Sequence, residues 1–301
     1  MKDGIARSPL FYVGDKYKLI KEIKTHFPPS TVRFIEPFVG GGSVFLNVNA
    51  DKYLLNDIDS YVISIHRLLC SYSKDRDKFF KSLFSLIDSY GLSLSYRENI
   101  IPDDLKKSFP KTYFAKYNKD AYARMKMDFN AGNCENIMML YALLIYGFNR
   151  MLRFNSKGEF NLPVGDVDFN KNTFVALDDY FRLVNDKNVN WYNMDFKVFL
   201  NWIEYCEGDL IYLDPPYLIS FSEYNKIWNE ENERDLLRIL DELSAKGVKW
   251  AISNVTHYRG RINNIFLDWS RGYNSFPIKS NYISFNDNSV KKFNEVLITN
   301  Y

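Results

Sequence analysis

The sequence predicts an α/β protein in which two α/β segments are separated by an inserted domain. "TVRFIEPF" is strand-like and runs into the glycines of "VGGGS", and "KYLLND" is a second short apolar run that ends on a carboxylate. Residues 68–167 show amphipathic helical patterns instead, and strand-like runs return after them. We therefore expect residues 1–67 and 168–301 to form one discontinuous domain that carries the insertion.

The composition is that of an ordinary globular protein without a strong charge bias. Of the 301 residues, 46% are hydrophobic and 25% are charged, which is enough to bury a large core. The 39 Lys and Arg against 37 Asp and Glu leave a net charge of +2, so bulk charge alone does not require a nucleic-acid partner. The three cysteines form no C-x-x-C pair and the three histidines have no ligand spacing, so we expect no disulfide framework and no metal.

The chain carries no recognisable signal for export or membrane insertion. Its first residues lack the long apolar core and cleavage site of a signal peptide. No stretch of about 18 apolar residues is present either. We therefore expect a cytoplasmic protein.

The expected helices follow from apolar residues at helical spacing. "KYKLIKEIKTHF" places Leu19, Ile20, Ile23 and Phe27 on one face and lysines on the other. "SVFLNVN" starts a helix after the glycines. The insertion contributes "RDKFFKSLFSLIDSYG", which ends at Gly91, and then "DAYARMKMDFNAG" and "ENIMMLYALLIYGF".

The expected strands of the second half are short apolar runs. The insertion closes with "MLRFN" and "EFNLP" on either side of Gly158, a pattern that predicts a β-hairpin. Three strand-like runs follow: "NVNWYNMDF", "DLIYLDPPY" and "KWAISN". A helix between the last two begins at Asn229 or Asn232 and ends at Gly247. The tail adds "SNYISF" and "FNEVLITNY".

The glycine cluster Gly40, Gly41 and Gly42 and the acid Asp57 together favour a nucleoside-containing cofactor. Glycines after a strand let the backbone approach a ligand closely, although a tight turn would also explain them. Asp57 ends the next strand, 17 residues after Gly40 (57 − 40), about where a ribose-binding acid stands in dinucleotide-type folds. Alone it reads equally well as a helix cap. No Lys-Ser/Thr follows the glycines, which argues against an NTP phosphate loop.

"DPPY", residues 214–217, has the chemistry needed to activate an exocyclic amino group. The lone pair of such a nitrogen is delocalised into the base, so the nitrogen attacks a methyl group only when acceptors hold its two hydrogens. The carboxylate of Asp214 and the carbonyl of Pro215 can accept them, and Pro215 and Pro216 offer no competing N–H. Tyr217 offers a face for stacking a base. A capped turn with a packed tyrosine is the alternative.

These motifs, in this order, resemble the Dam-type, class alpha, adenine-N6 DNA methyltransferases, and within them the T-even phage branch. The resemblance rests on "FYVGDKYKLI", "FIEPFVGGGSVFLN", "NDID", "RFNSKGEFNLPVG", "DPPYLISFSEYNKIWNEENERDLL" and "WAISN", nearly the whole chain. It implies a Rossmann-like class I core with a seven-stranded, mostly parallel sheet that has one antiparallel strand near the C-terminus. It also implies that the insertion, helical with a β-hairpin, recognises DNA, and that 1–67 and 168–301 form the catalytic domain.

The resemblance also implies a cofactor, S-adenosyl-L-methionine, and the residues around it. Asp57 would hold the ribose, while Asp195 and Phe196 would meet the adenine of the cofactor. Asp214, Pro215, Pro216 and Tyr217 would hold the target adenine. The full set of implied cofactor residues is Tyr12, Lys16, Glu36, Pro37, Phe38, Gly40, Gly41, Gly42, Asp57, Asp195, Phe196 and Asp214.

For the partner, double-stranded DNA, the resemblance points to the hairpin. Arg153 suits guanine and Asn155 suits adenine, though both could be merely solvated hairpin residues. Two departures from the family pattern are Asp166, at a position after "P-x-G" that is often basic in the family, and Phe11, where the bacterial housekeeping enzyme of the family has a base-contacting lysine. The remaining implied DNA contacts are Arg124, Asn149, Met151, Pro163, Lys291 and Lys292.

Several functional alternatives stay open at this point. GATC is the expected target, but the same fold could methylate cytosine N4 or RNA adenine, and an inactive homologue could simply bind DNA. Base choice rests on the first position of "DPPY", Asp214, which is typical of adenine enzymes. We expect a monomer or weak dimer in a bacterial or phage-infected cell. A solitary role and a restriction–modification role are equally compatible with the sequence.

Overall fold

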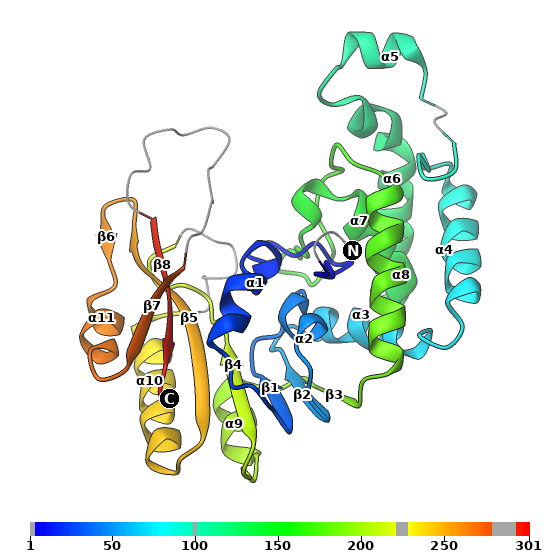
Figure 1. Cartoon of the computed structure of the whole chain (residues 1–301). Coiled ribbons are helices and arrows are strands. Elements are labelled where there is room, and N and C mark those ends of the chain that lie inside the picture. Colours follow the sequence, from blue (N-terminus) through cyan, green and yellow to red (C-terminus); the bar gives the residue numbers. More distant parts are fainter. Residues whose placement is uncertain (1–3, 99–100, 221–227, 279–292) are drawn as a thin grey trace. The chain divides into compact units, whose positions relative to one another are not determined.

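The computed structural model describes residues 4–98, 101–220, 228–278 and 293–301 (Figure 1). The chain divides into two compact units, which we describe separately. The first, helical unit comprises Met1–Asp15, Gly40–Leu46 and Asp59–Asp186. The second, sheet unit comprises Lys16–Val39, Asn47–Ile58 and Lys187–Tyr301.

The sheet unit holds all the strands that the structure describes. Its strands are β1 (Arg33–Glu36), β2 (Lys52–Asn56), β3 (Val189–Tyr192), β4 (Asp209–Leu213), β5 (Lys249–Tyr258), β6 (Arg261–Ile262), β7 (Asn274–Ile278) and β8 (Phe293–Thr299). Its helices are η1 (Lys16–Lys18), α1 (Ile20–Ile23), η2 (Lys24–His26), α9 (Phe196–Trp202), α10 (Glu230–Ala245) and α11 (Asn264–Ser270).

The strands form one sheet in the order β3-β2-β1-β4-β5-β8-β7, with the short β6 paired to β5 outside this path. The pairs β3–β2, β2–β1, β1–β4 and β4–β5 are parallel, whereas β8 is antiparallel to both β5 and β7. The expected seven-stranded, mostly parallel sheet with an antiparallel strand near the C-terminus is therefore confirmed. β6 is an additional two-residue strand.

The core of the sheet unit explains why the central strands read as continuous apolar runs. All five residues of β4 are buried, as expected for a strand covered on both faces. Ile211, Trp250 and Leu240 join one hydrophobic cluster that links β4, β5 and α10. Asn229 caps α10, and the Asn229 and Asn232 side chains form a reciprocal capping box, which confirms the expected helix start.

The helical unit contains the predicted helices of the insertion together with elements on either side of it. These are α3 (Ser60–Ser71), α4 (Arg76–Tyr90), α5 (Asp103–Ser108), α6 (Tyr113–Ala131), α7 (Ile137–Tyr146), η3 (Phe148–Arg150) and α8 (Lys171–Asn185), while α2 (Ser43–Asn47) begins in this unit. α4 ends at Gly91, whose φ of 74° is the left-handed conformation expected of a glycine cap. Residues 68–167 lie wholly within this unit, and their role in DNA recognition stays a prediction.

The expected hairpin at 151–163 forms two antiparallel segments, which isolated bridges hold together in place of regular strands. Phe154 bridges Phe160, and the N–H of Asn161 donates to the carbonyl of Arg153 at 2.9 Å. The Asn155 side chain closes the turn because its Oδ1 accepts from the N–H groups of Lys157 and Glu159. Side-chain bonds thus take part of the place of a regular ladder.

Three other expectations differ from the structure or lie beyond it. The first helix, expected over 16–27, is split into η1, the one-turn α1 and η2. β7 was not predicted from the sequence, because "NSFPI" contains a proline and little alternation; its place at the edge of the sheet tolerates Pro277. The expected strand "SNYISF" lies outside the described residues.

Candidate active site

The candidate site of the sheet unit lies at the carboxyl ends of its parallel strands. β1 and β4 are neighbours in the sheet although they are far apart in the chain, and the strand order reverses between them. Ligands of open α/β sheets bind at such a reversal. Glu36 ends β1, Asp57 follows β2 and Asp214 follows β4, so the topology places these three acids on one edge.

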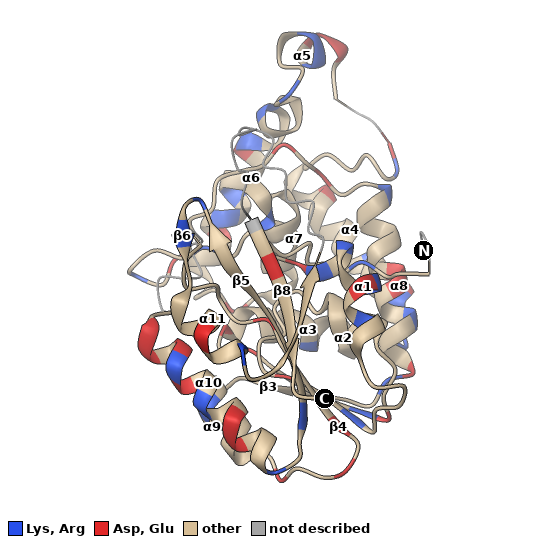
Figure 2. Cartoon of the chain, turned by 60° about the vertical axis from the view of Figure 1, so that its left-hand side comes forward, with Lys and Arg blue, Asp and Glu red and all other residues tan. Residues whose placement is uncertain are grey.

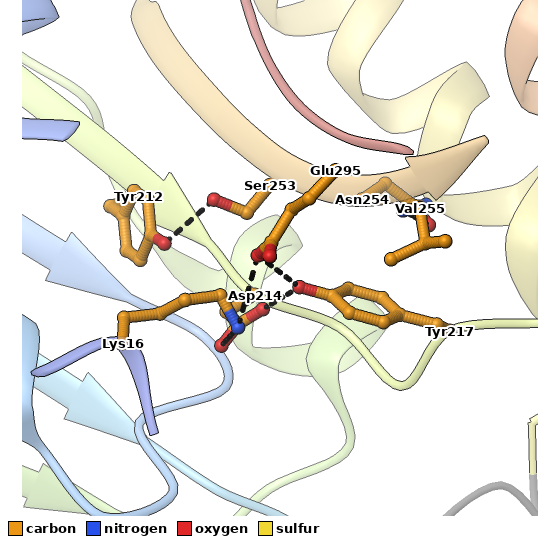
Figure 3. A network of polar contacts seen from close by, with 8 residues as sticks. All are labelled: Lys16, Tyr212, Asp214, Tyr217, Ser253, Asn254, Val255 and Glu295. Carbon is orange, nitrogen blue, oxygen red and sulfur yellow. Dashed lines mark hydrogen bonds and ion pairs between the residues drawn. The ribbon is translucent and has the colours of Figure 1, made fainter. Parts of the chain in front are cut away.

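Asp214 is held by two hydrogen-bond donors from the same unit (Figure 3). The Lys16 ammonium donates to Asp214 Oδ2 at 2.7 Å, and the Tyr217 hydroxyl donates to Asp214 Oδ1 at 2.9 Å. The Lys16 Nζ also lies 5.2 Å from the centre of the Tyr217 ring. These contacts fix the orientation of the carboxylate, and each oxygen keeps a further lone pair for a substrate hydrogen.

A second carboxylate, that of Glu295 on β8, completes this cluster. Glu295 Oε1 lies 3.7 Å from Lys16 Nζ and 3.1 Å from the Tyr217 hydroxyl. The side chains of Lys16 and Glu295 are 3% and 1% exposed, so the charges face one another away from water. Burial and then the charges of Asp214 and Glu295 raise the pKa of Tyr217 well above its usual value, which keeps the hydroxyl protonated.

Glu295 was missed by sequence reasoning. It stands in "NEVLI" near the C-terminus, and only the antiparallel pairing of β8 with β5 brings it to the strand end that carries Asp214. A single acid in a strand-like run was the available signal.

The ends of β1, β2 and β3 are joined by one buried amide, Asn56. Its Nδ2 donates to the carbonyls of Pro37 and Met194, at 3.0 Å each, and its Oδ1 accepts from the Met194 N–H at 2.9 Å. The amide therefore ties together the segments that carry Phe38, Asp57 and Asp195. Buried polar networks that are satisfied in this way rigidify their surroundings.

Three aromatic rings pack together beside these strand ends. Phe38, Phe196 and Trp228 have ring centroids 5.4 to 5.7 Å apart. The Trp228 indole donates to Glu233 Oε2 at 2.7 Å, and the buried Glu233 also accepts from Asn254 and Asn263. Burial raises the pKa of Glu233, and the three donors act in the opposite direction. This aromatic group suits the flat adenine of a cofactor.

Asp195 caps a helix, whatever its role in binding. Its Oδ1 accepts from the Lys197 N–H at 2.9 Å and caps α9. The carbonyl of Asp57 accepts from the Asn193 side chain at 2.8 Å, which positions the backbone at that acid.

The glycine turn belongs to the helical unit, where Tyr12 packs on it. A Cβ added to Gly41 would come within 2.7 Å of Tyr12 Cβ, and one added to Gly42 would overlap the Phe45 ring. Gly40 and Gly42 also have φ values of 45° and 78°. The predicted need for glycine here is therefore physical: two positions need positive φ and two have no room for a side chain.

His66 on α3 holds this turn through a hydrogen bond. Its Nε2 lies 2.9 Å from the Gly40 carbonyl and its Nδ1 lies 3.1 Å from the Tyr180 hydroxyl. Because the carbonyl can only accept, Nε2 carries the hydrogen and Tyr180 donates to Nδ1. Burial lowers the pKa of His66 to about 4, so the ring is neutral at physiological pH.

The predicted DNA-reading residues lie in the helical unit and are already bonded there. The Arg153 guanidinium donates to the side chain and the carbonyl of Asn161, at 2.9 and 2.8 Å. Arg153 is exposed, and its remaining N–H groups can face a partner. Asn155 is half-buried and donates to Glu159 in addition to closing the turn, so it has less capacity to read a base.

The other predicted DNA residues are scattered over this unit. Arg124 is exposed on α6 and donates to the Tyr90 carbonyl at 2.9 Å. Asn149 is exposed with a φ of 53°, Pro163 is exposed and Met151 is half-buried. Lys291 and Lys292 lie outside the described residues.

The two departures from the family pattern have structural explanations. Asp166 Oδ1 accepts from the N–H groups of Phe114 and Ala115, at 3.0 and 3.3 Å, and so caps α6 from a distance. Phe11 is flanked by two guanidinium groups, those of Arg150 and Arg7, at 3.8 and 4.5 Å from its ring centre. The place of a basic residue is thus taken by a ring that carries basic neighbours.

Two features are absent from the described part of the chain. No group of three or more His, Cys, Asp or Glu side chains there could hold a metal ion. Within the same residues, no helix combines the length and apolar character of a membrane span.

His66 generates a testable pH dependence. The pKa of His66 is about 4 in the folded state and 6.5 in the unfolded chain. Between these pH values the unfolded chain binds more protons than the folded state, so the folded state loses stability as pH falls. From pH 7.5 to 4.5 the advantage of wild type over His66→Gln in free energy of unfolding should shrink by about 2 to 3 kcal/mol. Urea denaturation of both proteins at each pH measures it. An advantage that does not change with pH would contradict this account.

Comparison with known proteins agrees with the geometry. Residues 12–286 match the family model of the D12 class N6 adenine-specific DNA methyltransferases. The chain is 34% identical to the type II methyltransferase M.FokI of Planomicrobium okeanokoites and 32% identical to the modification methylase StsI of Streptococcus sanguinis, over 98% of this chain in both cases. It spans only 43% of the length of each.

A third relative is matched over most of its own length. The DNA adenine methylase of Escherichia coli K12 is 27% identical to this chain, over 82% of this chain and 80% of that protein. The family match, over residues 12–286, covers both the glycine turn and the "DPPY" segment. The chain belongs to the D12 class of N6 adenine-specific DNA methyltransferases.

Proposed function

We propose that the chain transfers a methyl group from S-adenosyl-L-methionine to N6 of a flipped adenine in double-stranded DNA. The observation that carries this proposal is the state of Asp214 at the end of β4: a half-buried carboxylate, fixed by Lys16 and Tyr217 and followed by two prolines. Such an acceptor is what the amino group of adenine requires.

The reaction needs acceptors for hydrogens more than it needs a nucleophile. Asp214 and the Pro215 carbonyl accept the two N6 hydrogens, so the nitrogen lone pair can localise toward the methyl donor. Because the carboxylate is held before the base arrives, little reorganisation accompanies the development of charge on nitrogen. Tyr217 provides the ring on which the flipped base stacks.

The residues of the sheet unit fit the proposed cofactor. Phe38, Phe196 and Trp228 offer an aromatic surface for its adenine, and Asp57 offers a carboxylate for its ribose hydroxyls. In the helical unit, Gly41 brings the backbone directly against Tyr12, where no side chain would fit. When bound, the sulfonium supplies an activated methyl group, so this chain has only to position the two reactants.

The helical unit supplies the basic surface that we propose for DNA. In Figure 2, the ribbon shows Lys and Arg positions along α5 and α6, with the acidic Asp103 and Asp104 in the first turn of α5. The exposed ones there include Lys107, Lys111, Lys116, Lys119 and Arg124. These suit phosphates, whereas Arg153 suits a base edge.

The relatives point to two different kinds of target sequence. GATC follows from the likeness to Dam enzymes, but the greater identity to M.FokI and StsI favours a modification methylase and a target of its own. The likeness to the T-even phage branch stays a prediction, as do the cytoplasmic location and the monomeric or weakly dimeric state. Cytosine-N4 and RNA adenine are the alternative substrates, and an inactive DNA-binding homologue is the non-enzymatic alternative.

Removal of the Asp214 carboxylate should abolish methylation. With labelled cofactor and genomic DNA, Asp214→Ala should lose at least about 10²-fold in rate, because a held acceptor is lost from the reacting nitrogen. The measurement is label in N6-methyladenine after digestion to nucleosides. Thr25→Ala, at an exposed hydroxyl that contacts only the local backbone, is the control and should match wild type. Label in N4-methylcytosine, or undiminished label with Asp214→Ala, would contradict the proposal.

Arg153 should affect the choice of sequence more than affinity for DNA in general. Arg153→Ala should cost about 1 to 3 kcal/mol of discrimination at one base pair of the target. Lys119→Ala should weaken binding to all sequences alike and reduce its salt dependence. Methylation rates on a target and its single-pair variants, with both proteins, separate the two effects. Equal loss on every sequence for Arg153→Ala would exclude it as a reader.

A further inference from the structure

One hydroxyl in the candidate site touches two carboxylates. The Tyr217 oxygen lies 2.9 Å from Asp214 Oδ1 and 3.1 Å from Glu295 Oε1. A tyrosine carries a single hydrogen, so it cannot donate fully to both at once. Both contacts are satisfied together only when one carboxyl holds a proton and donates it to the hydroxyl. Asp214, Tyr217 and Glu295 in Figure 3 therefore form a hydrogen-bonded series in which a proton can reside on either carboxyl.

The position of Lys16 makes the two ends of this chain unequal. Its ammonium is 2.7 Å from Asp214 Oδ2 and 3.7 Å from Glu295 Oε1. Because Coulomb attraction grows as the distance shortens, the ammonium favours negative charge on Asp214 and leaves Glu295 as the better place for a proton. The Glu295 side chain is 1% exposed, so burial also favours Glu295 as the place where a newly released proton comes to rest.

The proposed reaction releases a proton at this place. When the N6–C bond forms and the S–C bond of the donor breaks, N6 holds one hydrogen more than the neutral product. Asp214 is the proposed acceptor for N6 hydrogens, so it receives this proton. It must lose the proton again to regain its ion pair with Lys16.

We propose that Asp214, Tyr217 and Glu295 form a proton relay that carries the proton released from N6 to Glu295. Before methyl transfer both carboxylates are ionised and face the Lys16 ammonium. After Asp214 has taken the N6 proton, it passes this proton to the Tyr217 oxygen while the Tyr217 hydroxyl hydrogen moves to Glu295 Oε1. The result is a neutral N6-methylamino group on adenine, an ionised Asp214, an intact tyrosine and a protonated Glu295. Electrons and protons balance without another reactant. The inference rests on the proposed function and assigns Glu295 as a positioning and proton-accepting residue.

Other ionisable groups in the described part of the chain lie near the relay. Tyr212 on β4 feels the charges of Asp214, Glu36 and Glu295, and its hydroxyl is bonded to Ser253 at 2.8 Å. Among the described hydrogen bonds, Tyr212 has none to Tyr217 or Glu295. Lys16 is the cation of the cluster, and its ammonium is a donor only. The Asp214–Tyr217–Glu295 order is thus the path that the described contacts support.

The test is single-turnover methylation by the full chain, with enzyme in excess over DNA that carries its target. Glu295→Gln keeps the shape of the side chain but cannot take the proton. Its rate at pH 7 should fall roughly 10²-fold, while cofactor and DNA dissociation constants stay within about twofold. Tyr217→Phe should lose a similar factor. The double variant should lose no more than the worse single variant, because both break one path.

Controls separate this role from folding and from the proposed function itself. Ser253→Ala removes a neighbouring buried hydroxyl outside the relay and should retain a rate near wild type. If Glu295→Gln does not fold, Tyr217→Phe carries the same comparison. Raising the pH to 9 should restore part of the lost rate, because hydroxide can then remove the proton.

Three outcomes would overturn the relay. These are a Glu295→Gln rate within about twofold of wild type, losses that multiply in the double variant, and a rate loss matched by lost affinity for cofactor or DNA. Wild-type activity in the same assay keeps the two proposals apart. If wild type methylates adenine and Glu295→Gln does so at the same rate, only the relay is contradicted. If wild type methylates no adenine, the proposed function is contradicted.

Discussion

The ion pair between Lys16 and Asp214 is the interaction on which the candidate site depends. It joins the first residues of the sheet unit to the end of β4, and the same ammonium faces Glu295 on β8. Without that charge, two neighbouring carboxylates would face each other in a largely buried place, and a pair broken in this way is strongly destabilising. The cluster therefore holds these three segments of the sheet unit together, and it also contains the groups that we propose to act on adenine.

The parallel topology of the sheet brings the residues of the candidate site together. Side-by-side parallel strands end on one edge, so β1, β2 and β4 deliver residues that are far apart in the chain to one place. Asn56 ties the ends of β1, β2 and β3 together, and Glu233 anchors the ring of Trp228 beside them. In the helical unit, His66 holds the glycine turn in a comparable way. The strand ends, Trp228 and the glycine turn are thus each held by a buried polar group.

The sequence predicted what depends on local pattern and on ordered motifs. The α/β core, the capping of α10 at Asn229 and the glycine turn follow from periodicity, capping chemistry and the need for positive φ. What it did not reveal depends on tertiary pairing: Glu295 reaches Tyr217 only through β8, and Asp166 caps a helix some fifty residues away in the chain. The edge strand β7 escaped notice because Pro277 obscures its pattern.

The central claim is that this chain marks adenine at a defined site in DNA. Methylation-sensitive sequencing of DNA from cells that express the full chain tests it most directly, because base and surrounding sequence are read together. The account predicts N6-methyladenine at one short motif, present with the wild type and absent with Asp214→Asn. Methylated cytosine, adenine marks without a motif, or unmarked DNA in cells that contain folded protein would contradict it.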